Sequence, residues 1–352
     1  MEHVSNVLVV MDPEVRADEE RIQRSLVRAM KLADRTRCHL ELLLVTSDPA
    51  IENPFFVLPS RAEAARRSYA DEQFRWLDDI RARLERNGYD VSCEVRVDRP
   101  EADAIVRKVT EAKPDLVVKH PEHHAFKIGL FGNTDWDLVR RCPAPLLFSR
   151  KAGLDEGKPV LVGVDPTRTL RGTDDDLDDQ LIRAARHFSV LFDGPLHVLH
   201  TYQVPRVMPG YDGYMPMYPI MPIQGTGAAA SPVASPQKNA EDRLAIERRH
   251  GEVLEAFARR HDLEFDHVKL APGPAHEMIC READAIGAGL IVMGALERSR
   301  LDRVLLDVDA EPVLAGTECD VLFLKPASFM APDLHTEDAY VRSSGAVPEQ
   351  PG

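Results

Sequence analysis

The stretch Asn6-Val-Leu-Val-Val-Met-Asp12-Pro13 decides the fold of this 352-residue chain, because it returns as Pro159-Val-Leu-Val-Gly-Val-Asp165-Pro166. Each copy is a continuous apolar run closed by Asp-Pro, which is typical of a strand buried on both faces of a parallel sheet. After each copy, apolar residues recur at helical spacing, over residues 22–33 and 177–188. The chain therefore reads as two head-to-tail copies of one unit.

The same order of elements continues through each half. Further strands are expected at 39–45, 91–97, 116–119 and 146–148, and at 196–202, 290–293 and 321–324. Further helices are expected around 71–86 and 102–109, and around 241–260 and 279–286. Strands that alternate with helices predict right-handed βαβ crossovers and a doubly wound parallel sheet, which is an α/β fold.

The predicted domains are residues 1–150 and 158–326, joined by a Gly- and charge-rich linker at 151–157. Residues 204–236 form an irregular insert inside the second domain, rich in Met and Tyr at its start and in Gly, Ala, Ser and Pro at its end. An unstructured loop of this length is usually functional or disordered. The polar tail at 327–352 is expected to be disordered.

The composition excludes several function classes. The formal net charge is −14, and so acidic a surface repels phosphate backbones and anionic lipid, which argues against nucleic-acid and membrane-surface binding. We find neither a signal-peptide pattern nor a run of 18 apolar residues. The five cysteines are scattered, with no C-x-x-C pair, as in a reducing compartment. These observations predict a cytoplasmic protein.

Two motifs in the first half carry a family resemblance. Phe131-Gly-Asn-Thr-Asp-Trp136 and Arg141-Cys-Pro-Ala-Pro-Leu-Leu147 look like a Gly-Ser/Thr-Thr-Ala-Glu helix start followed by a Cys-Pro-x-Pro entry into the last strand. In the second half, Leu290-Ile-Val-Met-Gly294 and Cys319-Asp-Val-Leu322 occupy the same places. Over residues 1–326 the chain resembles the tandem, two-domain members of the universal stress protein family.

The resemblance implies two Rossmann-like domains of the adenine nucleotide alpha hydrolase-like kind. Each would hold its own five-stranded parallel sheet with strand order 3-2-1-4-5. Because dimers of this family form by pairing of single domains, it also implies that the two halves pair within the chain as a pseudo-dimer.

The resemblance further implies a nucleotide site, from which this sequence departs. ATP-binding members carry Gly-x-x-Gly, nine residues and Gly-Ser/Thr, because glycines let the backbone approach phosphate at a helix N-terminus. The first half has His120 and His123 at the leading glycines, and the second keeps Gly294 but has Glu297 and Asp307 at later positions. ATP is therefore a possible but disfavoured cofactor, and no other cofactor is predicted. The residual nucleotide-type loop of the first domain comprises Asp12, Gly132, Asn133 and Thr134.

Of two other features, the first leaves a binding role open and the second does not predict a metal site. Asp12 and Asp165 end strands at the edge where open α/β sheets bind ligands, and in ATP-binding relatives this region lies against the nucleotide. Equally, Asp-Pro simply ends a strand and starts a turn. The pair His120 and His123 with a nearby Glu could ligate zinc, but no further His or Cys pair is spaced to complete four ligands, so no metal site is predicted.

The sequence therefore predicts a universal-stress-type binding or regulatory protein of the stress response, without catalysis, because no nucleophile elbow or Walker loop is present. A small ligand or a protein partner is expected at the second half, between the strand ends and the insert. The residues expected to bind there are Asp165, Tyr202, Gly294, Arg298, Met215 and Met217. Two alternatives stay open: an ATP-binding, weakly hydrolysing regulator, and a carrier of an apolar small molecule beneath the insert.

Overall fold

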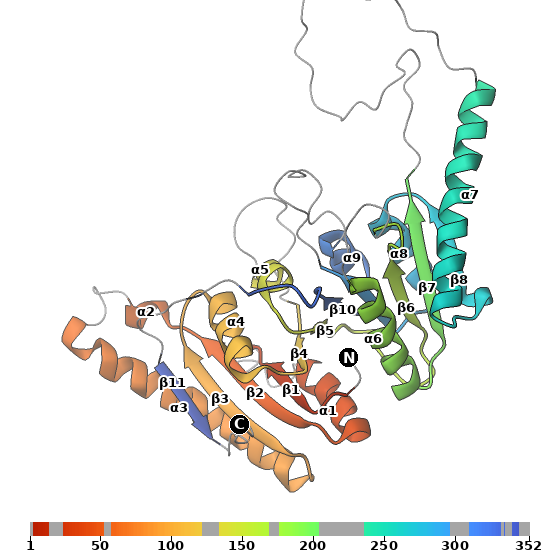
Figure 1. Ribbon diagram of the computed structural model, residues 1–352. Coiled ribbons are helices and arrows are strands. Elements are labelled where there is room, and N and C mark those ends of the chain that lie inside the picture. The colour runs from red at the N-terminus through yellow and green to blue at the C-terminus, as the bar shows by residue number, and fades with distance from the viewer. Residues whose placement is uncertain are drawn as a thin grey trace, which may run out of the picture.

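The structure is a computed structural model that describes residues 3–13, 24–52, 58–121, 134–168, 176–203, 236–295, 310–331, 334 and 340–344. Over these residues eleven strands form one continuous sheet, in the order β11-β3-β2-β1-β4-β5-β10-β9-β6-β7-β8 (Figure 1). The strands of the first half are β1 (Asn6–Val10), β2 (His39–Thr46), β3 (Val91–Val97), β4 (Leu116–Lys119) and β5 (Leu146–Phe148). Those that follow are β6 (Val160–Val164), β7 (Leu196–Tyr202), β8 (Val268–Pro272), β9 (Leu290–Gly294), β10 (Asp320–Leu324) and β11 (Tyr340–Ser344).

The expectation of two separate five-stranded sheets is wrong. Within each half the core strands run parallel, but β5 and β10 pair antiparallel at the centre, with Leu147 opposite Leu322. A short strand left at the edge of each half would expose unpaired backbone N–H and C=O groups. Pairing β5 with β10 satisfies both edges at once and joins the halves into one sheet.

The expectation of a disordered tail fails over Tyr340–Ser344. This segment forms β11 and pairs antiparallel with β3, so that Tyr340 lies opposite Val97 and Ser344 opposite Cys93. β11 thus lies at the far end of the first half, beside the outermost of its core strands (Figure 1).

Helices cover both faces of the sheet. They are α1 (Arg24–Thr36), α2 (Pro49–Glu52), α3 (Pro59–Arg86), α4 (Glu101–Ala112), α5 (Thr134–Arg141), α6 (Leu177–Leu191), α7 (Pro236–Arg260), α8 (Ala275–Ile286) and α9 (Ala310–Gly316), with a 3-10 turn η3 at Phe265–His267. Both α3 and α7 begin earlier than their apolar periodicity predicts, because their first turns are polar and Pro starts each helix. None of the described helices is both long and apolar enough to cross a bilayer.

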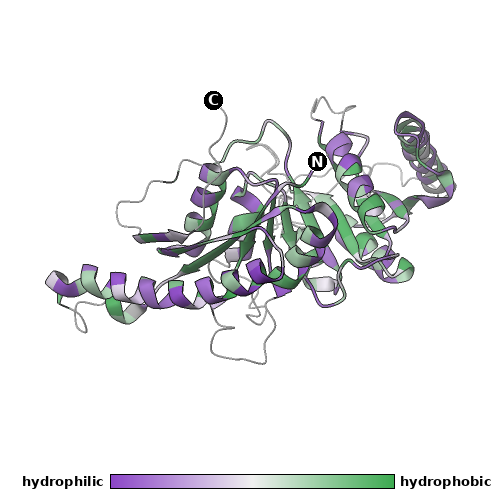
Figure 2. Cartoon of the chain, turned by 90° about the horizontal axis from the view of Figure 1, so that it is seen from below, coloured by the Kyte–Doolittle hydropathy of each residue, from purple (hydrophilic) through white to green (hydrophobic). Residues whose placement is uncertain are grey.

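Each face of the sheet has one core that runs through both halves. One core gathers side chains of α1, α3, α6 and α7, among them Leu32, Leu77, Phe188 and Leu254. The other gathers side chains of α4, α5, α8 and α9, among them Ile105, Leu138, Ile279 and Val313. Figure 2 shows the apolar strands between helices whose outer surfaces are polar. The hydrophobic burial that stabilises each half is therefore shared with the other.

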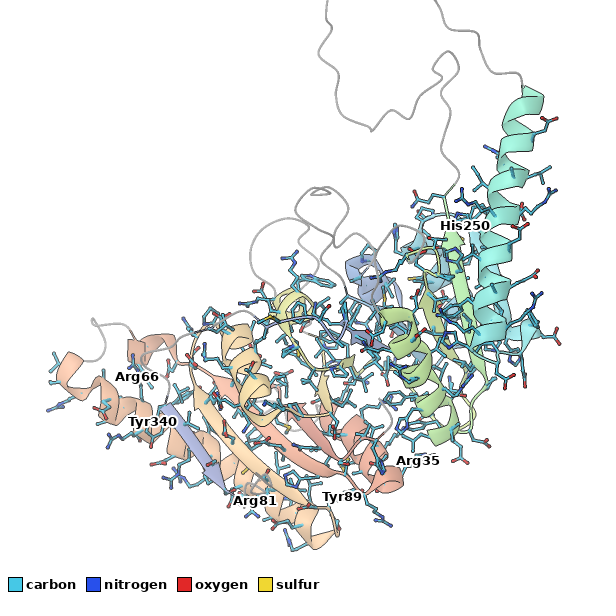
Figure 3. The ribbon with its side chains drawn as sticks, viewed as in Figure 1. Arg35, Arg66, Arg81, Tyr89, His250 and Tyr340 are labelled. Carbon is cyan, nitrogen blue, oxygen red and sulfur yellow. The ribbon has the colours of Figure 1, made fainter. Side chains whose placement is uncertain are left out.

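The linker between the halves lies against α1. Arg28 Nη1 donates to the carbonyl oxygen of Leu154, and Lys31 forms an ion pair with Asp155. Arg35, at the end of α1 (Figure 3), places Nη2 3.2 Å from Glu156 Oε2 and donates from Nε to the carbonyl oxygen of Leu191 at 3.0 Å. One basic face of α1 thus fixes an acidic linker and the end of α6.

Candidate functional site

A cavity of about 340 Å³ opens at the carboxyl ends of β1, β2 and β3. Its walls include Pro13, Thr46, Ser47, Asp98, Arg99 and Glu101. Open α/β sheets bind ligands in the crevice outside the carboxyl ends of their strands, and this cavity has that position. Its volume lies at the low end of the ~300–1,000 Å³ range of ligand pockets, which suits a small molecule.

Polar groups in this cavity are held in fixed positions. Arg99 donates from Nε to Ser47 Oγ at 2.6 Å, which joins the end of β3 to the end of β2. Asp98 accepts the backbone N–H of Arg99 at 2.7 Å through Oδ1, and its other oxygen forms an ion pair with Arg107. Hydroxyl, guanidinium and carboxylate groups therefore stand beside the apolar Val45. A small polar molecule with both donors and acceptors fits this lining.

The start of α5 is occupied by the protein's own charges. Lys119 Nζ lies 2.9 Å from Asp135 Oδ1, and both side chains are buried, at 6% and 3% exposure. Asp135 and Asp137 lie in the first turn of α5, where the helix dipole favours negative charge. The first turn of α5 therefore carries two carboxylates, one of them buried against Lys119, and this negative charge disfavours an anion there.

The residual loop of the first domain is only partly described. Asp12 follows β1, beside the cavity wall formed by Pro13, and Thr134 is the first residue of α5. Gly132 and Asn133 lie outside the described residues. His120 Nδ1 is 2.7 Å from the carbonyl oxygen of Ser149, and since a carbonyl only accepts, Nδ1 carries the proton.

In the second half, the side chain of Asp165 accepts hydrogen bonds within the turn that it starts. Its Oδ1 accepts the hydroxyl of Thr167 at 2.5 Å and the backbone N–H of Thr167 at 3.3 Å. Its backbone N–H donates to Asp178 Oδ1 at 3.2 Å. Such short-range bonds are what an Asp provides when it closes a strand and starts a turn. Of the two readings of the Asp-Pro motif, these bonds favour the turn at this position.

Packing explains why a glycine stands at position 294. It ends β9, and a Cβ at this position would lie 2.7 Å from Cδ2 of Leu177, the buried first residue of α6. The sequence suggested that this glycine admits a ligand to the backbone. The space beside it holds a leucine side chain instead, so the missing Cβ serves the contact between α6 and β9.

Tyr202 lies in a cluster with two histidines, between β7 and α7. The ring of His250 stacks on Tyr202 with centroids 5.2 Å apart and on the buried His200 at 5.1 Å. His200 Nδ1 is 3.0 Å from the carbonyl oxygen of Val164, so it donates there, and a neutral His200 accepts from His250 Nδ1 through Nε2 at 2.8 Å. Burial raises the pKa of Tyr202, and the charge of Glu247 acts in the same direction.

The two histidines were missed at the level of sequence. A signal existed for His200, which precedes Tyr202 by two residues in a strand and so shares its face. Nothing in the sequence pairs His250 with either residue. Figure 3 shows His250 on α7, beside the end of β7.

The structure places three of the predicted residues at the carboxyl ends of neighbouring strands. They are Asp165 after β6, Tyr202 at the end of β7 and Gly294 at the end of β9. Met215, Met217 and Arg298, the other residues predicted to bind there, lie outside the described residues. Within the described part of the chain, no group of three or more His, Cys, Asp or Glu side chains is arranged to hold a metal ion.

The chain belongs to the universal stress protein family, whose sequence model matches residues 3–150 and 157–325. The resemblance noted from the sequence motifs is thereby confirmed, and the two matched regions confirm the tandem repeat. The chain is similar over nearly its whole length to proteins called universal stress protein E. The one from Salmonella typhi is 25% identical over 335 residues, covering 95% of this chain and 98% of that protein. The one from Escherichia coli is 25% identical over 328 residues, covering 93% and 96%.

Two solved structures share the fold over both halves. A functionally unknown protein from Pseudomonas aeruginosa PAO1 aligns with a TM-score of 0.62 at 23% identity, covering 92% of this chain and 94% of that one. A universal stress protein from Archaeoglobus fulgidus aligns with a TM-score of 0.56 at 17% identity, covering 92% and 98%. These likenesses support the arrangement of two α/β units in one chain.

Proposed function

We propose that this member of the stress-response family works by binding, without catalysis, and that it takes a small polar molecule at the carboxyl edge of its first half. The observation that carries the proposal is the cavity between the ends of β1, β2 and β3, with Ser47, Asp98 and Arg99 held in its wall. A molecule of nucleoside size suits this cavity better than a triphosphate, because its volume of about 340 Å³ is at the low end of the range for ligand pockets.

The proposal includes the pairing of the two halves as a pseudo-dimer within one chain. Support comes from the antiparallel contact of β5 with β10 and from the cores that run through both halves. In this arrangement the second half contributes what a separate subunit would contribute in a single-domain relative: a partner strand and apolar surface.

A second ligand or partner site beneath the insert of the second half stays a prediction, as does the carrier function that would depend on it. The observation that favours such a site is the stack of Tyr202 and His250 at the end of β7, in which Tyr202 is buried and the His250 ring is partly exposed. The other two predicted residues that the structure describes give less support to this site. Asp165 is hydrogen-bonded within its own turn, and Gly294 packs against Leu177.

The cavity is tested by filling it. In Ser47→Trp the indole occupies the space between the strand ends, whereas Ser60→Trp, at an exposed position near the start of α3, is the matched control. Adenosine and AMP serve as probes in isothermal titration calorimetry, and native mass spectrometry reads the molecules that co-purify with each protein from its own cells. We expect Ser47→Trp to weaken binding by at least about tenfold, or about 1.4 kcal/mol, and to lose a co-purifying molecule that Ser60→Trp retains. Equal binding by the two variants would contradict the proposal.

A further inference from the structure

The outer edge of β3 is covered by a strand from the end of the chain. β11 pairs antiparallel with β3, with Arg342 opposite Val95. An uncovered β3 would present a row of unpaired N–H and C=O groups, which is a template for any extended segment. Figure 1 shows β11 along β3 and beside α3, and the position that β11 fills between the edge of β3 and α3 is called the groove below.

Side chains of α3 recognise particular residues of β11. Arg342 lies over the ring of Phe74 at 5.5 Å and places Nε 3.4 Å from Asp71 Oδ1. Ser344 Oγ lies 3.1 Å from Cys93 Sγ and 3.4 Å from Asp78 Oδ1. The arginine of β11 therefore contacts an aromatic ring and one carboxylate, and the serine hydroxyl two residues later contacts a second carboxylate.

The groove is larger than its present occupant. A hollow of about 640 Å³ adjoins Arg342, lined by Arg67, Asp71, Phe74 and Arg75 of α3. The Asp71 side chain is about half exposed, and its Oδ1 lies 3.4 Å from Arg342 Nε without a shorter hydrogen bond from any of the described residues. A guanidinium seated more deeply than that of Arg342 would satisfy this oxygen, since arginine can bind a carboxylate in a bidentate manner.

The opposite end of the sheet is protected in another way. Its outermost strand, β8, has five residues, ends in Pro272, which lacks an N–H, and carries Lys269 paired with Glu282. Edge prolines and lysines are common devices against strand addition. β3 has seven residues and contains neither, so its edge relies on β11.

We propose that the groove between α3 and β3 is a docking site for an extended segment of a protein partner, and that β11 is an internal stand-in for that segment. The partner adds an antiparallel strand to β3, with arginine at the place of Arg342 and serine or threonine two residues later. This is strand addition, in which backbone hydrogen bonds provide affinity and side-chain pockets provide specificity.

The stand-in is weakly held, which makes exchange feasible. The three central residues of β11 are exposed, and the Arg342–Asp71 pair is about half exposed on both sides. Ion pairs with that exposure contribute little. Residues 325–339 connect β10 to β11, and a tether of this length keeps the stand-in at an effective concentration that a partner segment must overcome.

The probe for the test is a fluorescent peptide of residues 338–346, measured by fluorescence anisotropy against full-length proteins. Arg342→Ala removes both the ion pair with Asp71 and the contact with the Phe74 ring, so the peptide should bind this variant about threefold to tenfold more tightly than wild type. Ser344→Cys, oxidised to a disulfide with Cys93, locks β11 in place and should show no peptide binding until it is reduced. The same peptide with Arg342→Ala should bind poorly, whereas the peptide with Ser343→Ala, which alters the opposite face of the strand, should bind normally.

Several results would overturn the proposal. The first is that the peptide binds the locked variant as tightly before reduction as after it. The second is that the peptide binds equally well without its arginine, and the third is that it binds none of the variants. Asp71→Asn in the Arg342→Ala background provides a second check, because loss of this carboxylate should weaken the peptide severalfold without removing the backbone pairing.

Discussion

Arg28 of α1 and Asp320 of β10 form a buried ion pair between the two halves, with Nε 2.6 Å from Oδ2. The same carboxylate accepts the backbone N–H of Arg150 at 2.7 Å and that of Leu154 at 3.1 Å. Gly153 passes so close that a Cβ there would lie 2.0 Å from Asp320 Oδ1. One carboxylate thus holds the linker, the first helix and the last core strand of the second half.

Removing this carboxylate should destabilise the whole protein. We expect Asp320→Ala to lower the free energy of unfolding by about 3–5 kcal/mol, because the buried Arg28 then keeps only the carbonyl oxygen of Leu154 and the more distant Asp155, 4.0 Å away, as partners. The control is Glu255→Ala, which removes the exposed partner of Arg259 and should cost about 1 kcal/mol or less. Urea unfolding followed by circular dichroism measures both. Similar losses for the two variants would show that the buried pair has no special role.

Glu94 should make stability depend on pH. Burial acts to raise its pKa, but the hydrogen bond from Lys108 and the charge of Arg96 outweigh burial and lower it below 4.5. The stabilisation is therefore fully present above about pH 4.5 and is lost as the pH falls through the lower pKa of the folded state. We expect Glu94→Gln to cost about 1.5–3 kcal/mol at pH 7 and progressively less in acid. Glu63→Gln, at an exposed pair, should show no such trend.

Gly294→Ala separates packing from ligand binding at the end of β9. The added methyl group meets the buried Leu177, so we expect a loss of about 1–3 kcal/mol in the free energy of unfolding. In a Leu177→Ala background the methyl group has room, and the same substitution should cost almost nothing. A double-mutant cycle by thermal unfolding gives this coupling. Equal costs in both backgrounds would contradict the packing explanation.

ATP with magnesium should stabilise the protein very little. The leading glycines are replaced by His120 and His123 in the first half, and Asp135 occupies the start of α5. A ligand present at its dissociation constant adds only about RT ln 2, or roughly 0.4 kcal/mol. At millimolar ATP we therefore expect a rise in Tm of about a degree at most, measured by differential scanning fluorimetry. A micromolar Kd by calorimetry would refute this expectation.

The insert of the second half is tested by deletion. Residues 208–235 are replaced by a short Gly/Ser bridge, which leaves β7 and the whole of α7 in place. If the insert covers a ligand, molecules that co-purify with the full-length protein should be lost from the deletion variant in native mass spectrometry. Undiminished retention would exclude a covering role. A partner surface would instead appear as a protein captured by the full-length chain and not by the deletion variant.

The parallel core could be predicted because its strands are long apolar runs ended by Asp-Pro or flanked by amphipathic helices. The antiparallel pairing of β5 with β10 could not be predicted, because Leu146–Phe148 is too short to show which strand lies beside it. β11 was missed because Tyr340–Ser344 is mostly polar and lies in a Pro- and Gly-containing tail. Its stability comes from the backbone of β3, which no local pattern records.

The candidate site was predictable only in part. The edge of the sheet follows from parallel topology, and Asp165, Tyr202 and Gly294 lie at that edge as expected. Their contacts depend on partners distant in the sequence, such as His250 on α7 and Leu177 on α6. The cavity of the first half escaped prediction for the same reason, since Ser47 and Arg99 meet only after β2 and β3 pair.

The pairing of β5 with β10 has a consequence for how the two halves can change. In a symmetric assembly of identical subunits every substitution occurs twice, on both sides of the axis. Here each residue occurs once, so Leu147 and Leu322 face each other as separately variable positions. One half can lose its glycines, acquire an insert or gain an edge strand while the other keeps its shape. The differences between the two carboxyl edges are the kind of divergence that a single chain permits.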